Sequence, residues 1–143
     1  MTLTEAHADQ IAALLNGRNQ LTKKYSRGSI LNQAANYLCR FSESNKVIAC
    51  VEVKYVQWYQ TEVLHLVVDK SEVRKGHAKA LLCEAERVSS ANGARLLQCT
   101  IREDNTESRS LFEGFGFSQV SRFFNSHSNN NVAVFQKVLS IAR

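Results

Sequence analysis

The fold is decided by residues 68–82, which read VDKSEVRKGHAKALL. An apolar strand expected at Thr61–Val68 ends in a short polar loop, and a helix begins at Gly76. A helix start presents free backbone N–H groups and the positive end of the helix dipole, so it attracts an anion. Gly76 removes a side chain that would block a phosphate, and Arg74 and Lys79 add positive charge. The stretch predicts a phosphate-binding loop, although it matches neither the P-loop nor the dinucleotide-binding glycine pattern.

A strand–helix–strand unit surrounds this loop. The helix expected at Gly76–Ala91 has one apolar side, and it ends at Asn92-Gly93, which tolerate the left-handed backbone of a helix C-terminus. An apolar strand follows at Leu96–Ile101. Because a helical crossover joins parallel strands, residues 61–101 predict a parallel pair. The near-continuous apolar run of Thr61–Val68 is typical of a central strand covered on both faces.

The remaining elements extend this unit into a mixed sheet. Apolar positions from Thr4 to Leu15 recur at helical spacing, and Asn16-Gly17 is expected to end that helix. The other expected elements are a short helix at Ile30–Asn36, strands at Tyr37–Phe41 and Val47–Gln57, a helix at Asn105–Glu113, and strands at Phe117–Phe124 and Val132–Leu139. The predicted fold class is therefore α/β with a mixed sheet, and residues 1–143 are expected to form one domain.

Composition and charge narrow the class of protein. The chain has 44% hydrophobic and 22% charged residues, its apolar runs are too short to span a membrane, and residues 1–5 do not resemble a signal peptide. We therefore expect a cytoplasmic protein. The net charge of +5 comes from scattered basic residues without a nucleic-acid recognition motif. The four cysteines, Cys39, Cys50, Cys83 and Cys99, lack metal-ligand spacing, so we expect buried, reduced thiols and no metal.

Two motifs in order carry a resemblance to a known family. Gly76-His77-Ala78, after the apolar strand, is similar to the pyrophosphate loop Gln/Arg-x-x-Gly-x-Gly/Ala of the GNAT superfamily of N-acetyltransferases. Downstream, the Asn105–Phe117 segment looks like the family's Asn-x-x-Ala-x-x-Leu-Tyr-x-x-x-Gly-Phe. The order of elements from Thr4 to Leu139 also follows the family. The resemblance implies the GNAT fold, in which two parallel strands splay apart between flanking helices.

The same resemblance implies acetyl-coenzyme A as the only cofactor and an amine, on a small molecule or a peptide, as the acceptor. Its coenzyme-binding residues correspond here to Leu66, Val67, Val68, Arg74, Lys75, Gly76, His77, Ala78, Lys79, Asn105 and Phe112. Two positions depart from the family. Val73 stands where Gln or Arg is usual, and Phe112 replaces a tyrosine that protonates the departing thiolate in many relatives. The alternative interpretation is therefore a non-catalytic acyl-CoA-binding module on the same fold.

A base must take a proton from the acceptor, because a lysine-like amine has a pKa of about 10.4. Glu62 is the first candidate by resemblance to histone-modifying relatives, and His65 is the second because imidazole titrates near neutrality. Strand alternation predicts that these two side chains point to opposite faces of the sheet. Glu52 is a weaker third candidate, and a backbone N–H near Val67 is the family-implied oxyanion donor.

The identity of the acceptor is not readable from the sequence. By resemblance, the segments that choose it are Asn16–Ser29, Gln57–Gln60 and Phe124–Asn131, and none of them matches an acceptor motif. Trp58 and Tyr59 either wall an acceptor pocket or fill a hairpin turn. His7 and His127 carry no pattern and are expected at the surface. Neither nucleic acid nor a membrane is an expected partner, and a homodimer remains an open alternative.

Overall fold

A computed structural model of the protein describes residues 2–18 and 24–139. The helices are α1 (Glu5–Arg18), α2 (Arg27–Leu31), α3 (His77–Ala91) and α4 (Thr106–Gly114), with short 3-10 turns η1 (Ala34–Asn36) and η2 (Lys70–Glu72). The strands are β1 (Tyr37–Phe41), β2 (Val47–Gln57), β3 (Gln60–Val68), β4 (Leu96–Arg102), β5 (Ser118–Asn125) and β6 (Asn130–Val138). The expected elements are therefore present, and the main differences lie at the first two helices.

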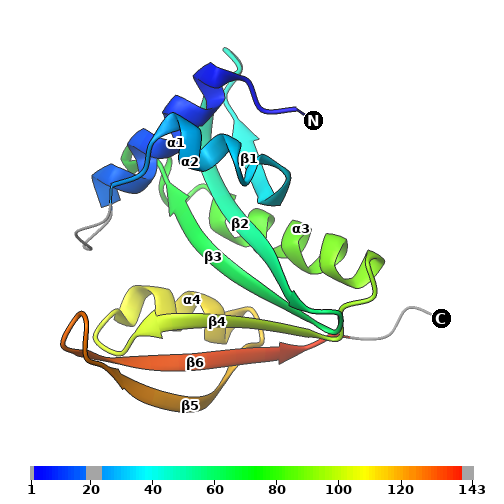
Figure 1. Cartoon of the computed structure of the whole chain (residues 1–143), viewed down its shortest axis with the longest axis vertical. Coiled ribbons are helices and arrows are strands. Elements are labelled where there is room, and N and C mark those ends of the chain that lie inside the picture. The colour runs from blue at the N-terminus through cyan, green and yellow to red at the C-terminus, as the bar shows by residue number, and fades with distance from the viewer. Residues whose placement is uncertain (1, 19–23, 140–143) are drawn as a thin grey trace.

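One mixed sheet contains all the strands, in the order β1-β2-β3-β4-β6-β5. Among the strands of the described residues, only β3 and β4 pair in parallel, and their register joins Gln60–Glu62 to Leu96–Gln98. After Glu62, β3 stays paired with β2 but diverges from β4, so the sheet opens into a V at its centre (Figure 1). The predicted splay of the two parallel strands is confirmed.

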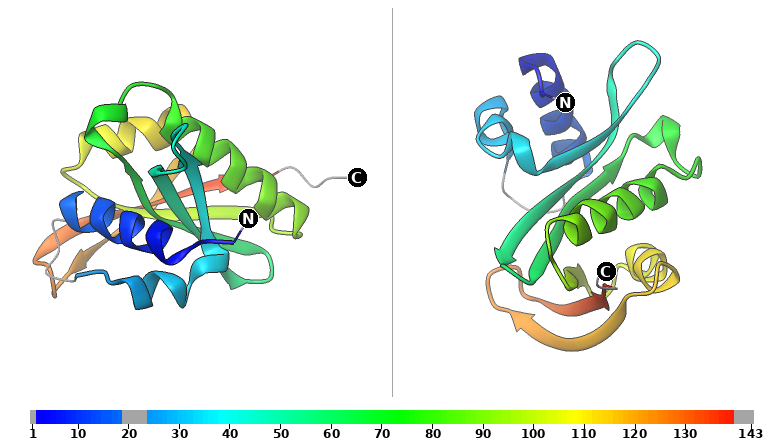
Figure 2. Two further views of the ribbon diagram at one scale, coloured as in Figure 1. Left: turned by 90° about the horizontal axis from the view of Figure 1, so that it is seen from above. Right: turned by 90° about the vertical axis from the view of Figure 1, so that its right-hand side faces the viewer.

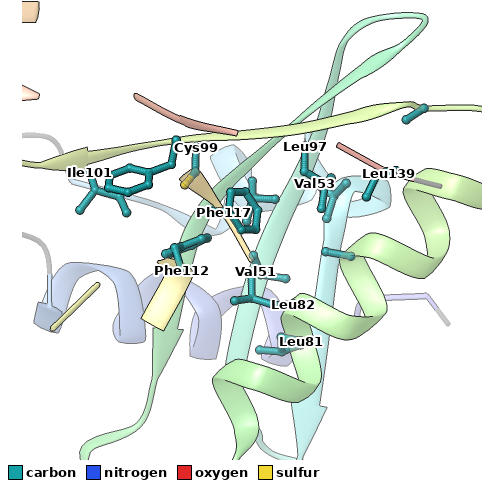
Figure 3. Packing of buried hydrophobic residues seen from close by; sticks show 14 of the residues in the cluster. Val51, Val53, Leu81, Leu82, Leu97, Cys99, Ile101, Phe112, Phe117 and Leu139 are labelled. Carbon is teal, nitrogen blue, oxygen red and sulfur yellow. The ribbon is translucent and has the colours of Figure 1, made fainter. Parts of the chain in front are cut away.

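Helices cover both faces of this sheet. Helices α1 and α2 lie on one face, and α3 and α4 lie on the other (Figure 2). The larger apolar cluster lies between α3, α4 and the sheet, and it includes Val51, Leu82, Leu97 and Phe117 (Figure 3). A smaller cluster under α1 includes Ile11. Because apolar burial occurs on both faces, the central strands are held rigidly where they diverge.

A β-bulge in β3 overturns one sequence expectation. Glu52 on β2 pairs with Leu64, and Cys50 pairs with Val67, so His65 and Leu66 together face a single residue of β2. His65 has a φ of +53°, a backbone conformation that residues other than glycine rarely adopt. Because one extra residue resets the alternation of a strand, the prediction that Glu62 and His65 lie on opposite faces is wrong. Both side chains point to the α1–α2 face.

Several smaller expectations also changed. Helix α1 continues past Asn16-Gly17 to Arg18. The short helix expected at Ile30–Asn36 is instead divided between α2, which starts earlier at Arg27, and η1. His7, expected at the surface, is buried, and its Nε2 lies 3.1 Å from the Asn45 carbonyl oxygen. Cys83, expected to be buried, is exposed on α3.

Candidate active site

The second half of β3 is not paired with β4. The residues predicted to pair with the pantetheine arm, Leu66, Val67 and Val68, lie beyond the last residue that pairs with β4. Their other edge is held by β2, where Ala49 pairs with Val68. An extended strand with one edge turned toward a divergent neighbour suits main-chain recognition of an extended ligand.

The loop before α3 has the backbone expected of an anion cradle. Arg74 and Gly76 have positive φ angles of 64° and 83°, and Gly76 is the N-cap of α3 without a side-chain cap. A Cβ built on Gly76 would meet no heavy atom within 4 Å. The backbone conformation therefore favours glycine, and no neighbouring atom fills the space beside it. Left-handed residues next to a helix N-terminus direct several N–H groups toward one point, as a pyrophosphate needs.

Charged side chains around this loop form a connected group. Glu72 Oε2 lies 2.9 Å from Lys75 Nζ and 3.6 Å from His77 Nε2. The hydrogen bond from Lys75 lowers the pKa of Glu72, so the carboxyl stays ionised. Arg40 on β1 donates from Nε to His77 Nδ1 at 3.3 Å. Arg40 was not predicted, because it comes from a strand far from the loop in sequence.

A second cluster lies at the bulge, on the opposite face from α3. His65 Nδ1 lies 2.8 Å from Oε1 of Glu52, and His65 Nε2 lies 2.7 Å from the hydroxyl of Tyr25. Glu52 is only 5% exposed, whereas the His65 side chain retains 30% exposure. Burial, and then the nearby charge of Glu52, raises the pKa of Tyr25. Sequence reasoning missed Tyr25, which occurs in a polar segment without a pattern.

Glu62 lies where β3 and β4 part, on the same face as His65. Gln98 Nε2 donates to Glu62 Oε2 at 3.3 Å, and Gln136 Nε2 donates to Gln98 Oε1 at 2.7 Å. Burial raises the pKa of Glu62, and the hydrogen bond from Gln98 partly opposes that rise. The two candidate bases therefore have different surroundings. Neutral amide side chains hydrogen-bond in sequence to Glu62, whereas His65 lies between two ionisable groups, Glu52 and Tyr25.

The second motif lies at the start and in the core of α4. The Asn105 side chain caps this helix by accepting from Ser108 N at 3.1 Å. Phe112 is 5% exposed and packs edge-on against Phe117, with ring centroids 5.1 Å apart (Figure 3). The Phe112 ring is therefore part of the hydrophobic core, and it has no hydroxyl that could act as a general acid. Contact of Asn105 or Phe112 with the coenzyme stays a prediction.

The predicted acceptor segments differ in their position relative to the cluster of Tyr25, His65 and Glu52. Tyr25 and Ser26 belong to the first segment, of which residues 19–23 lie outside the described residues. Trp58, 70% exposed, stacks edge-on against Tyr59 at the closed end of the V, where β3 and β4 remain paired (Figure 1). The hairpin-turn interpretation therefore fits Trp58 better than an acceptor pocket.

Two further features of the described residues bear on function. Within residues 2–18 and 24–139, no group of three or more His, Cys, Asp and Glu side chains is arranged to hold a metal ion. Within the same ranges, none of the helices has the length and apolar character needed to cross a bilayer.

Comparison with known proteins identifies the family to which the sequence is similar. The model of the acetyltransferase (GNAT) family matches residues 4–117. A curated relative, the [ribosomal protein bS18]-alanine N-acetyltransferase of Haemophilus ducreyi, is 29% identical over 99 residues, which are 68% of each chain.

Solved structures share the fold at lower identity. Ard1 from Thermoplasma volcanium superimposes with a TM-score of 0.84 at 15% identity, covering 98% of this chain and 96% of that one. A chain of the NatC complex bound to Gag peptide and CoA gives a TM-score of 0.82 at 17% identity, covering 98% of this chain and 97% of that one. Coenzyme A is therefore bound by a protein of this fold.

Proposed function

This chain belongs to the acetyltransferase (GNAT) family, and we propose that it transfers the acetyl group of acetyl-coenzyme A to the primary amine of a peptide or small-molecule acceptor. We treat residues 1–143 as one acetyltransferase domain. A single observation carries the proposal. Where β3 leaves β4, the imidazole of His65 is hydrogen-bonded to a buried carboxylate on one face of the sheet, and a loop with left-handed residues leads from the end of the strand to a helix N-terminus.

The donor side is assigned to the strand edge and the loop that follows it. The backbone of Leu66–Val68 would pair with the pantetheine arm, and the Arg74–Lys79 loop would hold the pyrophosphate. Asn105 and the start of α4 would border the other wall of the opening. Acetyl-coenzyme A supplies an activated thioester when it is bound. The backbone N–H near Val67 would then stabilise the oxyanion that develops on the acetyl group.

The acceptor side is assigned to the α1–α2 face. His65 is our first choice for the base, because its Nδ1 is paired with a buried carboxylate that stabilises the protonated imidazole. Glu62 would attract and orient the cationic acceptor, because it is an anion at the apex of the V with a fixed hydrogen-bond donor. These roles divide the two candidates between proton transfer and binding.

The relatives favour one acceptor class for the first test. The Haemophilus protein is named for acetylating an alanine of a ribosomal protein, and the NatC chain was solved with a peptide. We propose a peptide or protein N-terminal amine as the acceptor. An α-amine has a pKa of about 8, so a substantial fraction is already neutral near physiological pH.

Release of coenzyme A, detected with a thiol reagent, tests the proposal. The purified protein is mixed with acetyl-coenzyme A and a panel of peptides that differ at their first residue, together with polyamines, amino acids and aminoglycosides. We expect turnover with at least one primary amine, and mass spectrometry should find the added acetyl group on the amine nitrogen. Tight binding of acetyl-coenzyme A without turnover on any acceptor would instead support the non-catalytic alternative.

A further inference from the structure

Three side chains from three separate parts of the chain form one hydrogen-bonded line. Tyr25 precedes α2, His65 lies at the bulge of β3, and Glu52 lies on β2. The two distances along the line are 2.7 Å and 2.8 Å, both short enough for strong hydrogen bonds. A hydroxyl, an imidazole and a carboxylate thus stand in the same order as in a hydrolase triad, in which the carboxylate orients the imidazole and stabilises its charged form.

Each member of the line is held in place by other groups. The Asn16 side chain makes two hydrogen bonds to the backbone of Tyr25. Its Nδ2 donates to the Tyr25 carbonyl at 2.9 Å, and its Oδ1 accepts from the Tyr25 N–H at 2.8 Å. Asn36 Nδ2 lies 3.5 Å from the second oxygen of Glu52. The bulge sets the direction of His65. Rigid support of this kind is what a proton-transfer site requires.

The chemistry of the groups fixes the direction of the hydrogen bonds. An ionised carboxylate only accepts, so His65 Nδ1 carries its proton toward Glu52. In the neutral imidazole Nε2 is then an acceptor, and the Tyr25 hydroxyl donates to it. Other titratable groups border this line, namely Tyr37 at the start of β1 and Cys50 on β2, and burial followed by the charge of Glu52 raises the pKa of Tyr37. Tyr25 and Tyr37 both stay neutral near pH 7.

We propose that Tyr25, His65 and Glu52 act as one proton relay, in which the Tyr25 oxygen meets the acceptor amine. A cationic acceptor first gives its extra proton to water. As the neutral amine nitrogen then bonds to the acetyl carbon and the carbon–sulfur bond breaks, one of its two remaining protons passes to Tyr25 Oη. The phenol proton moves at the same time to His65 Nε2, and Glu52 stabilises the imidazolium. The imidazolium then returns its proton to water, and water protonates the thiolate, so protons and charge balance. The relay rests on the proposed transfer to an amine.

The position of Tyr25 explains why His65 would not act alone. The hydroxyl of Tyr25 already occupies His65 Nε2, which is the only imidazole nitrogen not facing Glu52. An amine reaching that nitrogen directly would have to displace the phenol. Tyr25 also belongs to the segment between α1 and α2, which was predicted to choose the acceptor. Binding of the acceptor and acceptance of its proton would therefore depend on the same segment.

Removal of one oxygen tests the relay. Tyr25→Phe keeps the ring contacts, and we expect it to lower kcat by roughly 10–10²-fold at pH 7 without changing the affinity for acetyl-coenzyme A. Tyr55→Phe is the matched control, because its hydroxyl bonds to the Val88 carbonyl on the opposite face. Because the relay acts on the neutral amine, a rise in pH should speed both proteins alike, and the fold loss at Tyr25 should persist through the pKa of the amine.

A double-mutant cycle separates a relay from a structural contact. His65→Asn is the second variant, because asparagine tolerates the positive φ of this position but cannot take a proton. Members of one relay are not additive, so Tyr25→Phe/His65→Asn should be no slower than His65→Asn within about threefold. Multiplied losses, or a lower thermal transition in Tyr25→Phe, would assign Tyr25 a structural role and overturn the relay.

Nitrogen NMR of the imidazole gives a readout independent of turnover. In the wild-type protein we expect His65 to carry its proton on Nδ1, with Nε2 shifted by the phenol hydrogen bond and that shift lost in Tyr25→Phe. A proton on Nε2 would reverse the line and overturn the relay. A wild-type protein that acetylates no amine overturns the proposed function and the relay with it. Turnover that is equally fast in wild type and Tyr25→Phe overturns the relay alone.

Discussion

The proposed donor side and the proposed acceptor side of this molecule are built in opposite ways. The anion cradle comes from one continuous segment, Val68–Lys79, and it depends on backbone conformation and a helix start. The relay instead comes from three segments up to 40 residues apart, and it depends on side-chain hydrogen bonds across a bulge. A local site of the first kind is visible in a sequence, whereas a site of the second kind depends on register. We therefore expect mutations at the cradle to lower coenzyme affinity, and mutations in the relay to lower kcat without changing that affinity.

The largest effect is expected at the cradle. Gly76→Asp puts a side chain at φ +83° and a negative charge beside the phosphates, so acetyl-coenzyme A affinity should fall by at least about 10²-fold. Calorimetry measures the affinity directly. Gly93→Asp is the matched control, because Gly93 has φ +89° at the other end of α3 and equally open surroundings. The control should match the loss of stability while keeping the affinity, and equal binding by both variants would remove the cradle assignment.

Glu52→Gln tests the acceptor side alone. The amide preserves the shape of the carboxylate but cannot stabilise a charged His65, so kcat should fall by roughly 10²-fold while coenzyme affinity stays unchanged. Some stability should be lost, because Glu52 accepts from both His65 Nδ1 and Asn36 Nδ2 and the amide nitrogen of Gln cannot accept. Glu84→Gln, on the exposed surface of α3, is the control. Loss of coenzyme binding in Glu52→Gln would contradict the independence of the two sides.

The bulge also explains what the sequence could not predict. The strand–helix–strand unit and Gly76 were readable because their signals are local, with a 3.6-residue period, a glycine and a change of polarity. No such signal marks the extra residue at His65, since His and Leu are compatible with a regular strand. That one residue turned the expected opposition of Glu62 and His65 into a shared face. Tyr25 was missed because His65, to which its hydroxyl is hydrogen-bonded, lies on a strand 40 residues further along the chain.

Glu62→Gln distinguishes orientation of the acceptor from base catalysis. If Glu62 binds the ammonium group, the KM for the amine should rise by about tenfold, with kcat changed less than threefold. If turnover instead slows by roughly 10²–10⁴-fold while His65→Asn stays active, Glu62 is the base.

Glu62→Gln should also raise the stability of the protein at neutral pH. Because burial raises the pKa of Glu62, the folded state holds this proton more tightly than the unfolded state. The free energy of unfolding therefore falls as the pH rises through the interval between the two pKa values. Glu62→Gln removes that fall, so its Tm should exceed that of wild type at neutral pH by less than about 4 °C. Scanning calorimetry at several pH values should show this gain disappear in acid.

The smallest catalytic effect is expected at Phe112, which is buried in the apolar core beside Phe117. A thiol pKa of about 8.5 is only some 1.5 units above neutral pH, so immediate protonation of the thiolate is worth roughly 2 kcal/mol. Phe112→Tyr should therefore leave kcat unchanged or raise it by at most about a hundredfold. In the packed pair with Phe117, a new hydroxyl without a partner should also lower stability by about 1–3 kcal/mol.

Phe117→Tyr separates these two consequences. Its ring is buried in the same pair, so the loss of stability should be similar, but no family tyrosine occurs at this position and kcat should not rise. Coenzyme A release by the three proteins, measured over a range of pH, compares them directly. If the wild-type protein is inactive and Phe112→Tyr is active, the missing hydroxyl is essential, and the Tyr25 relay cannot support turnover by itself. If both are active, proton removal on the acceptor side limits the reaction more than protonation on the donor side.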